Sequence, residues 1–133
     1  MFKTVLFPVD HSRGSQDAAK AVAEIVKFCG SRLIILSVED SGEEAEAHPG
    51  LSPEVIEQLL TSAKSTFSEW GIDAETLHRK GKPAFCICDV ADELQVDLIV
   101  MGCRGIGLTE EGAADSVSNR VINLSPCPVL VVP

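Results

Sequence analysis

Short runs of almost unbroken apolar residues recur along this chain, and no other feature constrains its fold as strongly. They cover residues 2–9, 32–38, 96–101 and 128–132, and a weaker, alternating run covers residues 72–78. Strands that are buried on both faces of a parallel sheet have this character. The chain of 133 residues is 45% hydrophobic and only 5% aromatic, which predicts a core of Val, Ile, Leu and Ala.

Helix signals separate these apolar runs. Capping residues, prolines at first helical positions and apolar residues at helical spacing predict helices over residues 12–29, 53–70, 83–94 and 115–124. The stretch 39–52 is different, because it is acidic and rich in Gly, Pro and Ser. We expect it to lack regular structure and to form a mobile flap.

Strands that alternate with helices pair in parallel through right-handed crossovers. The sequence therefore predicts an α/β fold with an open, doubly wound, five-stranded parallel sheet and helices on both faces, in a single domain over residues 1–133. With the strand order 3-2-1-4-5, the switch point of the sheet lies between the first and fourth strands. Ligands bind at such a point, where Asp10 and Gly102 would meet from opposite parts of the chain.

A glycine-rich loop follows the fourth strand. Gly102-Cys103-Arg104-Gly105 comes between a buried strand and a helix, an arrangement in which backbone N–H groups converge on phosphate. The alternative is that these are plain turn glycines. A P-loop is excluded, because Leu108 replaces the lysine that would reach the β- and γ-phosphates.

Charge and cysteine content exclude several classes of partner. The net charge of −9 argues against nucleic acid and anionic membranes as partners, because both need a basic face on the protein. No apolar run is long enough to cross a bilayer, and Met1 leads straight into a strand, so we expect a cytoplasmic protein without a signal peptide.

The five cysteines match neither a zinc site nor a disulfide framework, and we expect no metal. We interpret Cys103, beside Arg104, as a small tolerated residue in preference to a redox sensor.

Several motifs together resemble the universal stress protein family over essentially the whole chain. The matching pieces are residues 7–10 with Ser12, 36–38, 97–102, 116–118 and 126–132, with Gly81, Pro83, Ile87 and Ala91 between them. Nucleotide-binding members of the family carry the pattern Gly-x2-Gly-x9-Gly-Ser/Thr. Here Gly102 and Gly105 match, Asp115 stands in place of the third glycine, and Ser116 follows it.

The resemblance implies an adenine-nucleotide site in a fold of the adenine nucleotide alpha hydrolase type. In that site Asp10 would bond a ribose hydroxyl and the backbone of Val38 would face adenine. Phosphate would be held by Gly102, Gly105 and Ser116. The full set of expected contacts is Pro8, Val9, Asp10, Val38, Met101, Gly102, Arg104, Gly105, Ser116 and Val117. From the residues alone, Asp10 and Ser116 could each be a helix cap instead.

Acidic residues after the fourth strand bear on which nucleotide fits. A carboxylate about 4 Å from a phosphate costs ~1 kcal/mol per charge pair in water and ~4 kcal/mol at an effective dielectric of about 20. The segment carries Glu110, Glu111 and Asp115 but only one cation, Arg104. We therefore expect AMP or a cyclic AMP-like nucleotide as the ligand, in preference to ATP with Mg.

The last strand is expected at an edge of the sheet. Its apolar residues are Val129, Leu130, Val131 and Val132, and an exposed apolar edge invites pairing with another chain. The resemblance implies a homodimer through this strand.

The function that follows is a small, dimeric, stress-related regulator that binds an adenine nucleotide and has no efficient catalysis of its own. One alternative is a dimeric interaction module of the same fold that has lost nucleotide binding. A second is a slow nucleotide hydrolase, for which the sequence offers no pairing of a general base with a metal ligand beyond Asp10 and the loop acids.

Overall fold

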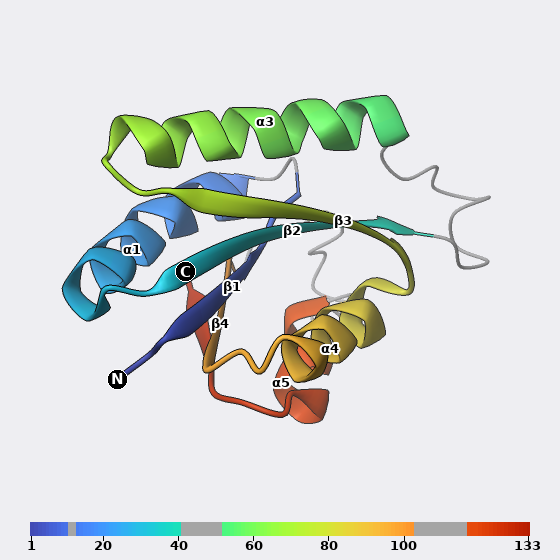
Figure 1. Ribbon diagram of the computed structural model, residues 1–133. Coiled ribbons are helices and arrows are strands. Elements are labelled where there is room, and N and C mark those ends of the chain that lie inside the picture. The colour runs from blue at the N-terminus through green and yellow to red at the C-terminus, as the bar shows by residue number, and fades with distance from the viewer. Residues whose placement is uncertain (11–12, 41–51, 103–116) are drawn as a thin grey trace.

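The computed structural model describes residues 1–10, 13–40, 52–102 and 117–133. Strands and helices alternate along them (Figure 1). The strands are β1 (Thr4–Pro8), β2 (Arg32–Asp40), β3 (Ala74–Gly81), β4 (Leu98–Gly102) and β5 (Val129–Val132). The helices are α1 (Arg13–Cys29), α3 (Pro53–Glu69), α4 (Pro83–Glu93) and α5 (Val117–Leu124).

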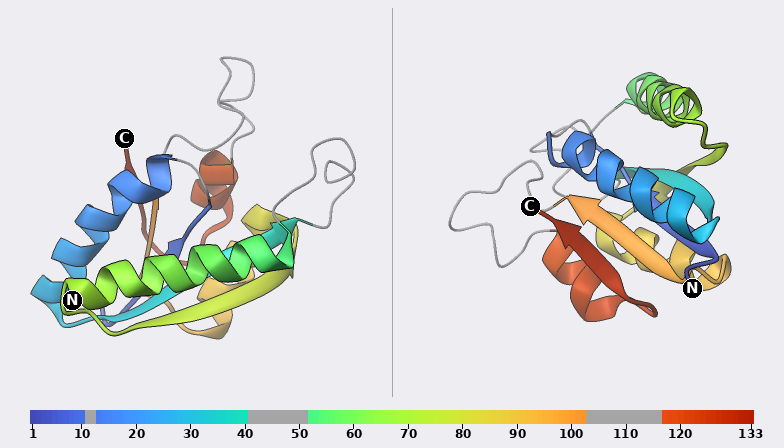
Figure 2. Two further views of the ribbon diagram at one scale, coloured as in Figure 1. Left: turned by 90° about the horizontal axis from the view of Figure 1, so that it is seen from above. Right: turned by 90° about the vertical axis from the view of Figure 1, so that its left-hand side faces the viewer.

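The five strands form one parallel sheet in the order β3-β2-β1-β4-β5, which confirms the predicted fold. Helices α1 and α3 cover one face of the sheet, and α4 and α5 cover the other (Figures 1 and 2). Strands β3 and β5 are the two edges, and β1 is central.

Burial on both faces explains the unbroken apolar runs of the sequence. In β1, Val5 and Phe7 pack into the core cluster beneath α1 and α3, whereas Leu6 packs into the cluster beneath α4 and α5. All three side chains are at most 1% exposed. Since neighbouring side chains of a strand point to opposite faces, a sheet with helices on both faces requires apolar residues at consecutive positions.

Local signals fix the beginnings and ends of the helices. The Ser52 hydroxyl accepts a hydrogen bond from the Val55 backbone N–H at 3.3 Å, and Pro53 takes the first position of α3, where its missing N–H costs nothing. Helix α1 is followed by Gly30 with φ +64°, a conformation that glycine adopts without strain. In the described ranges, no helix combines the length and apolar character that crossing a bilayer requires.

A carboxylate aligns β1 with β4 at the amino-terminal edge of the sheet. Asp97 Oδ2 accepts hydrogen bonds from the backbone N–H groups of Lys3 and Thr4, at 3.0 Å and 2.9 Å. The Asp97 N–H in turn donates to the Thr4 carbonyl at 2.9 Å. These bonds set the register of the two strands, so that their carboxyl ends finish at a common edge.

The predicted flap is wrong at its two ends. Glu39 and Asp40 belong to β2, where they pair with Lys80 and Gly81 of β3. Ser52 caps α3. Both strands end later along the chain than the predicted ranges 32–38 and 72–78. Their pairing continues past the apolar residues because backbone hydrogen bonds between strands do not depend on side-chain polarity. Residues 41–51, which make up the rest of the predicted flap, lie outside the described residues.

Candidate functional site

The carboxyl ends of β1 and β4 lie side by side at the switch point of the sheet. Leu6 of β1 pairs with Ile99 of β4. After β1 the chain passes through α1 to β2 on one side, and after β4 it reaches β5 on the other side. Asp10 lies four positions beyond Leu6, and Gly102 lies three positions beyond Ile99. The topology therefore brings Asp10 and Gly102 to the same edge of the sheet, as the sequence predicts.

The end of β2 lies level with Asp10. Pro8 pairs with Leu36, and Asp10 and Val38 each lie two positions beyond this pair. The pairing continues past the end of β1, since the Val9 N–H donates to the Leu36 carbonyl at 2.8 Å. Val9 is buried, whereas Pro8, Asp10 and Val38 are half-buried. The main chain before Asp10 is thus fixed against β2, and the aspartate lies where the core opens to solvent.

Helix α5 is attached to the end of β4 by a side-chain hydrogen bond. The Ser118 hydroxyl donates to the Gly102 carbonyl at 3.1 Å, in a partly buried position. Met101, just before this glycine, is buried, and Val117, the first residue of α5, is 40% exposed. The last residue of β4 and the first turn of α5 therefore lie together at the carboxyl edge of the sheet.

Sequence reasoning did not include Ser118 among the site residues. The signal was present, because a hydroxyl residue in the first turn of a helix commonly bonds a nearby backbone group. What the sequence lacks is the acceptor, since Gly102 is 16 positions away and becomes a neighbour only when α5 packs beneath the sheet.

Part of the predicted site lies outside the described residues. Three of the expected nucleotide contacts are among these positions, namely Arg104, Gly105 and Ser116. So are Cys103 and the three acidic residues that bear on the choice of nucleotide, Glu110, Glu111 and Asp115. The expected contacts that fall within the described residues are Pro8, Val9, Asp10, Val38, Met101, Gly102 and Val117, all of which lie at the carboxyl ends of β1, β2 and β4 or at the start of α5.

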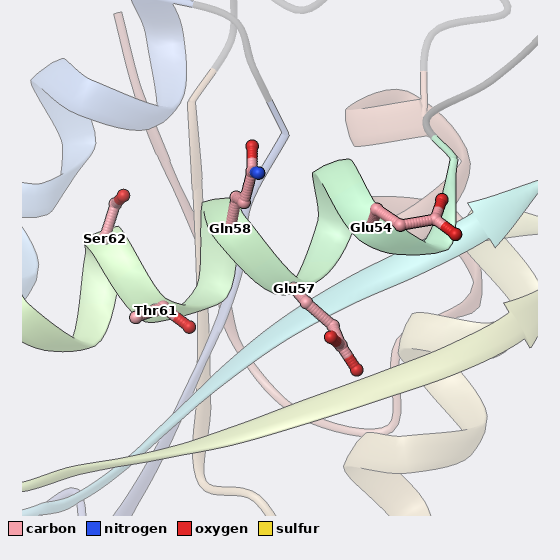
Figure 3. Close-up of a pocket in the computed structure, with 5 residues that line it drawn as sticks. All are labelled: Glu54, Glu57, Gln58, Thr61 and Ser62. Atoms are coloured by element: carbon pink, nitrogen blue, oxygen red, sulfur yellow. The ribbon is translucent and has the colours of Figure 1, made fainter.

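Two surface hollows in the described part of the chain lie elsewhere. One of about 400 Å³ follows α3 and is lined by Glu54, Glu57, Gln58, Thr61 and Ser62. Their side chains extend in different directions from the helix and do not converge on one point (Figure 3). The other, of about 350 Å³, lies between α3 and β3 and is lined by Glu57, Leu60, Thr61, Thr76 and His78. Neither hollow includes a residue of β1 or β4, so neither belongs to the switch point.

The described residues offer little metal or thiol chemistry. Among them, no group of three or more His, Cys, Asp and Glu side chains is placed to hold a metal ion. Burial raises the pKa of the Cys86, Cys88 and Cys127 thiols. These groups are therefore protonated at neutral pH, and the protonated thiol is a poor nucleophile and a poor metal ligand.

Strand β5 lies at an edge of the sheet, next to β4, as predicted. Val129, Val131 and Val132 are half-buried, and Leu130 is 39% exposed. The neighbouring helix α5 exposes Ile122 and Leu124 as well. Among the described strands, only β4 pairs with β5, so this end of the chain combines a strand edge with exposed apolar side chains.

Comparisons with known proteins agree with this architecture. The universal stress protein family model matches residues 1–133. A universal stress protein of Synechocystis sp. is 58% identical over 136 residues, which cover 100% of this chain and 87% of that relative.

Two solved structures share the fold. One is a universal stress protein in complex with cAMP, with a TM-score of 0.80 and 23% identity over 99% of this chain and 97% of that one. The other is the universal stress protein from Archaeoglobus fulgidus in complex with dAMP, with a TM-score of 0.70 and 21% identity over 98% of each chain. The family match over the whole chain and the Synechocystis relative show that this chain belongs to the universal stress protein family.

Proposed function

We propose that this protein binds an adenine nucleotide at the carboxyl ends of β1, β2 and β4 and acts as a small stress-related regulator without efficient catalysis. The observation that carries the proposal is the register of the sheet, which brings Asp10, Val38 and Gly102 to one edge at the switch point. Ligands of open α/β sheets bind at such a point. Two family members of the same fold hold adenine nucleotides, cAMP in one and dAMP in the other.

The residues at this edge suit the parts of a nucleotide. The half-buried Asp10 offers a carboxylate to a ribose hydroxyl, and the backbone of Val38, level with it on β2, offers polar groups to adenine. Gly102 and the first turn of α5 lie on the other side of β1, where phosphate would be bound. The N–H groups of a first helical turn lack intrahelical partners and attract anions.

A nucleotide with one phosphate is the favoured ligand. Residues 103–116 carry three carboxylates and one cation, and this excess of negative charge disfavours a triphosphate more than a monophosphate. Both nucleotides held by the two family members have a single phosphate. We therefore infer AMP or a cyclic AMP-like molecule as ligand, in preference to ATP with Mg.

A homodimer through β5 completes the proposal. No described strand pairs with the outer side of β5, and Leu130, Ile122 and Leu124 are exposed beside it. Pairing β5 with its own copy would satisfy the edge and cover apolar surface. We propose a cytoplasmic protein, and its net charge of −9 argues against nucleic-acid and anionic-membrane partners.

A dimeric interaction module without nucleotide binding is the second candidate, and Asp115 favours it. This aspartate replaces the third glycine of the nucleotide-binding pattern. One experiment separates the two candidates. The purified protein is denatured, any released nucleotide is identified by mass, and AMP, cyclic AMP and ATP are titrated by calorimetry. We expect AMP or cyclic AMP to bind more tightly than ATP. If none of the three nucleotides releases heat at millimolar concentration, nucleotide binding is rejected and the interaction module is the remaining candidate.

Replacing Asp115 with glycine is expected to favour ATP relative to AMP by about fivefold or more, since removing one repulsive charge pair is worth at least ~1 kcal/mol. Calorimetric titration of both nucleotides measures the ratio. Asp115→Asn keeps the size of the side chain and removes only its charge, so it should change the ratio in the same direction. An unchanged ratio in both variants would show that this charge does not select the ligand.

A further inference from the structure

A side-chain hydrogen bond between Ser118 and Gly102 joins α5 to the described part of the proposed site. The hydroxyl donates to the glycine carbonyl at 3.1 Å and bridges 16 positions of sequence. Both groups are only partly exposed, so water competes weakly for the bond. Gly102 is itself held in the sheet, where it pairs with Val132 of β5.

Packing of α5 directs this hydroxyl toward the sheet. Val121 is fully buried in the core cluster that also contains Ile99 and Met101 of β4. Ser118 lies three positions before Val121, and residues three apart share a face of a helix. The serine is therefore on the buried face of α5, one turn nearer its beginning, where the helix meets the end of β4.

We propose that Ser118 is a positioning residue of the nucleotide site, and this inference rests on the function proposed above. Its hydroxyl fixes the first turn of α5, including Val117, relative to Gly102, and both of these residues are candidate nucleotide contacts. The bond is made in the protein without ligand. It therefore raises affinity by holding the contacts in place before binding, without touching the nucleotide itself.

The geometry limits the effect to one part of the ligand. Ser118 and Gly102 lie on the β4 side of the switch point, whereas Asp10 and Val38 lie at the ends of β1 and β2. Loss of the serine hydroxyl should thus weaken binding of the phosphate and leave binding of the nucleoside unchanged. Comparing AMP with adenosine separates the two.

The chain offers a matched control at the other end of the same helix. The Ser125 hydroxyl, also partly buried, donates to the Cys127 carbonyl at 2.7 Å and accepts from the Cys127 N–H at 3.2 Å. Ser125→Ala therefore removes a comparable hydrogen-bonding hydroxyl, but one that does not reach Gly102. A merely structural role of serine hydroxyls around α5 would affect both variants alike.

The test is calorimetric titration of wild type, Ser118→Ala, Ser118→Thr and Ser125→Ala with AMP and with adenosine. We expect Ser118→Ala to weaken AMP binding about threefold to tenfold, as for one lost hydrogen bond, and to leave adenosine binding unchanged. Ser118→Thr keeps a hydroxyl and should bind AMP as wild type does. Ser125→Ala should also bind both ligands as wild type does, whatever it loses in thermal stability.

Four results would overturn the inference. Equal losses for AMP and adenosine in Ser118→Ala, or the same AMP loss in Ser125→Ala, would mean that the hydroxyl is only structural. Unchanged AMP binding in Ser118→Ala would show that Ser118 is not a positioning residue, although the proposed function would still hold. Failure of the wild-type protein to bind AMP would remove the proposed function and the inference together. If Ser118→Ala does not fold, Ser118→Thr and Ser118→Val, which share a shape and differ in the hydroxyl, provide the same comparison.

Discussion

Replacement of Phe67 by alanine is expected to lower the free energy of unfolding by about 3 to 5 kcal/mol, the usual cost of removing a buried aromatic ring. Phe67 is 1% exposed and comes from α3. Its ring meets Phe7 of β1 edge to face, with centroids 6.0 Å apart, and Trp70 in the same manner at 5.5 Å. The ring therefore joins α3 to the central strand, and its loss leaves a cavity that these neighbours cannot fill. Urea denaturation measures the change.

Phe28 gives a control for this substitution. It is also a helical phenylalanine, at the end of α1, but it is 92% exposed. Phe28→Ala should change the free energy of unfolding by less than about 0.5 kcal/mol, as expected for a surface position. Similar losses in the two variants would show that burial at Phe67 does not stabilise the fold as the packing indicates.

Asp10→Ala is expected to weaken binding of both AMP and adenosine by about tenfold to a hundredfold. The carboxylate lies half-buried at the end of β1, and hydrogen bonds to a charged group contribute about 1.5 to 3 kcal/mol. Because the ribose is common to both ligands, the two losses should be equal, unlike those of Ser118→Ala. Calorimetry with the same two ligands measures them.

Two further variants identify the cause of the Asp10 effect. Asp17 is exposed on α1, and Asp17→Ala changes the net charge by the same amount as Asp10→Ala. It should leave affinity unchanged, which excludes a general effect of charge. Asp10→Asn keeps an acceptor oxygen and should give an intermediate loss. Unchanged affinity in Asp10→Ala together with a lower melting temperature would mean that the aspartate only caps α1.

Most of the fold could be predicted, because its information is local. In β1 and β4 consecutive apolar residues identify doubly buried strands, and the prolines at positions 53 and 83 identify helix starts. The ends of the strands were less predictable. Glu39 and Asp40 carry no strand signal of their own, and they are in β2 because the backbone of β3 is available to pair with them.

The candidate site could be predicted less completely. Asp10 and Gly102 were found from their places at strand ends, and the sheet order brings those ends to one edge. The sequence does not point to Ser118, because its proposed role depends on a hydrogen bond to the Gly102 carbonyl, which is 16 positions away along the chain. A hydrogen bond between two elements requires both to be placed, and no pattern within either one specifies the distance between them.

The sequence by itself determined which segments are strands and helices, the family, and the excess of acidic residues after β4, on which the proposed preference for a nucleotide with one phosphate rests. Only the tertiary structure decided which backbone and side-chain groups meet at the carboxyl edge. The alignment of β1 with β4 through Asp97 and the attachment of α5 through Ser118 join residues 93 and 16 positions apart. The physical reason is that burial and propensity act along the chain, whereas a binding site depends on the relative placement of segments that meet only after packing.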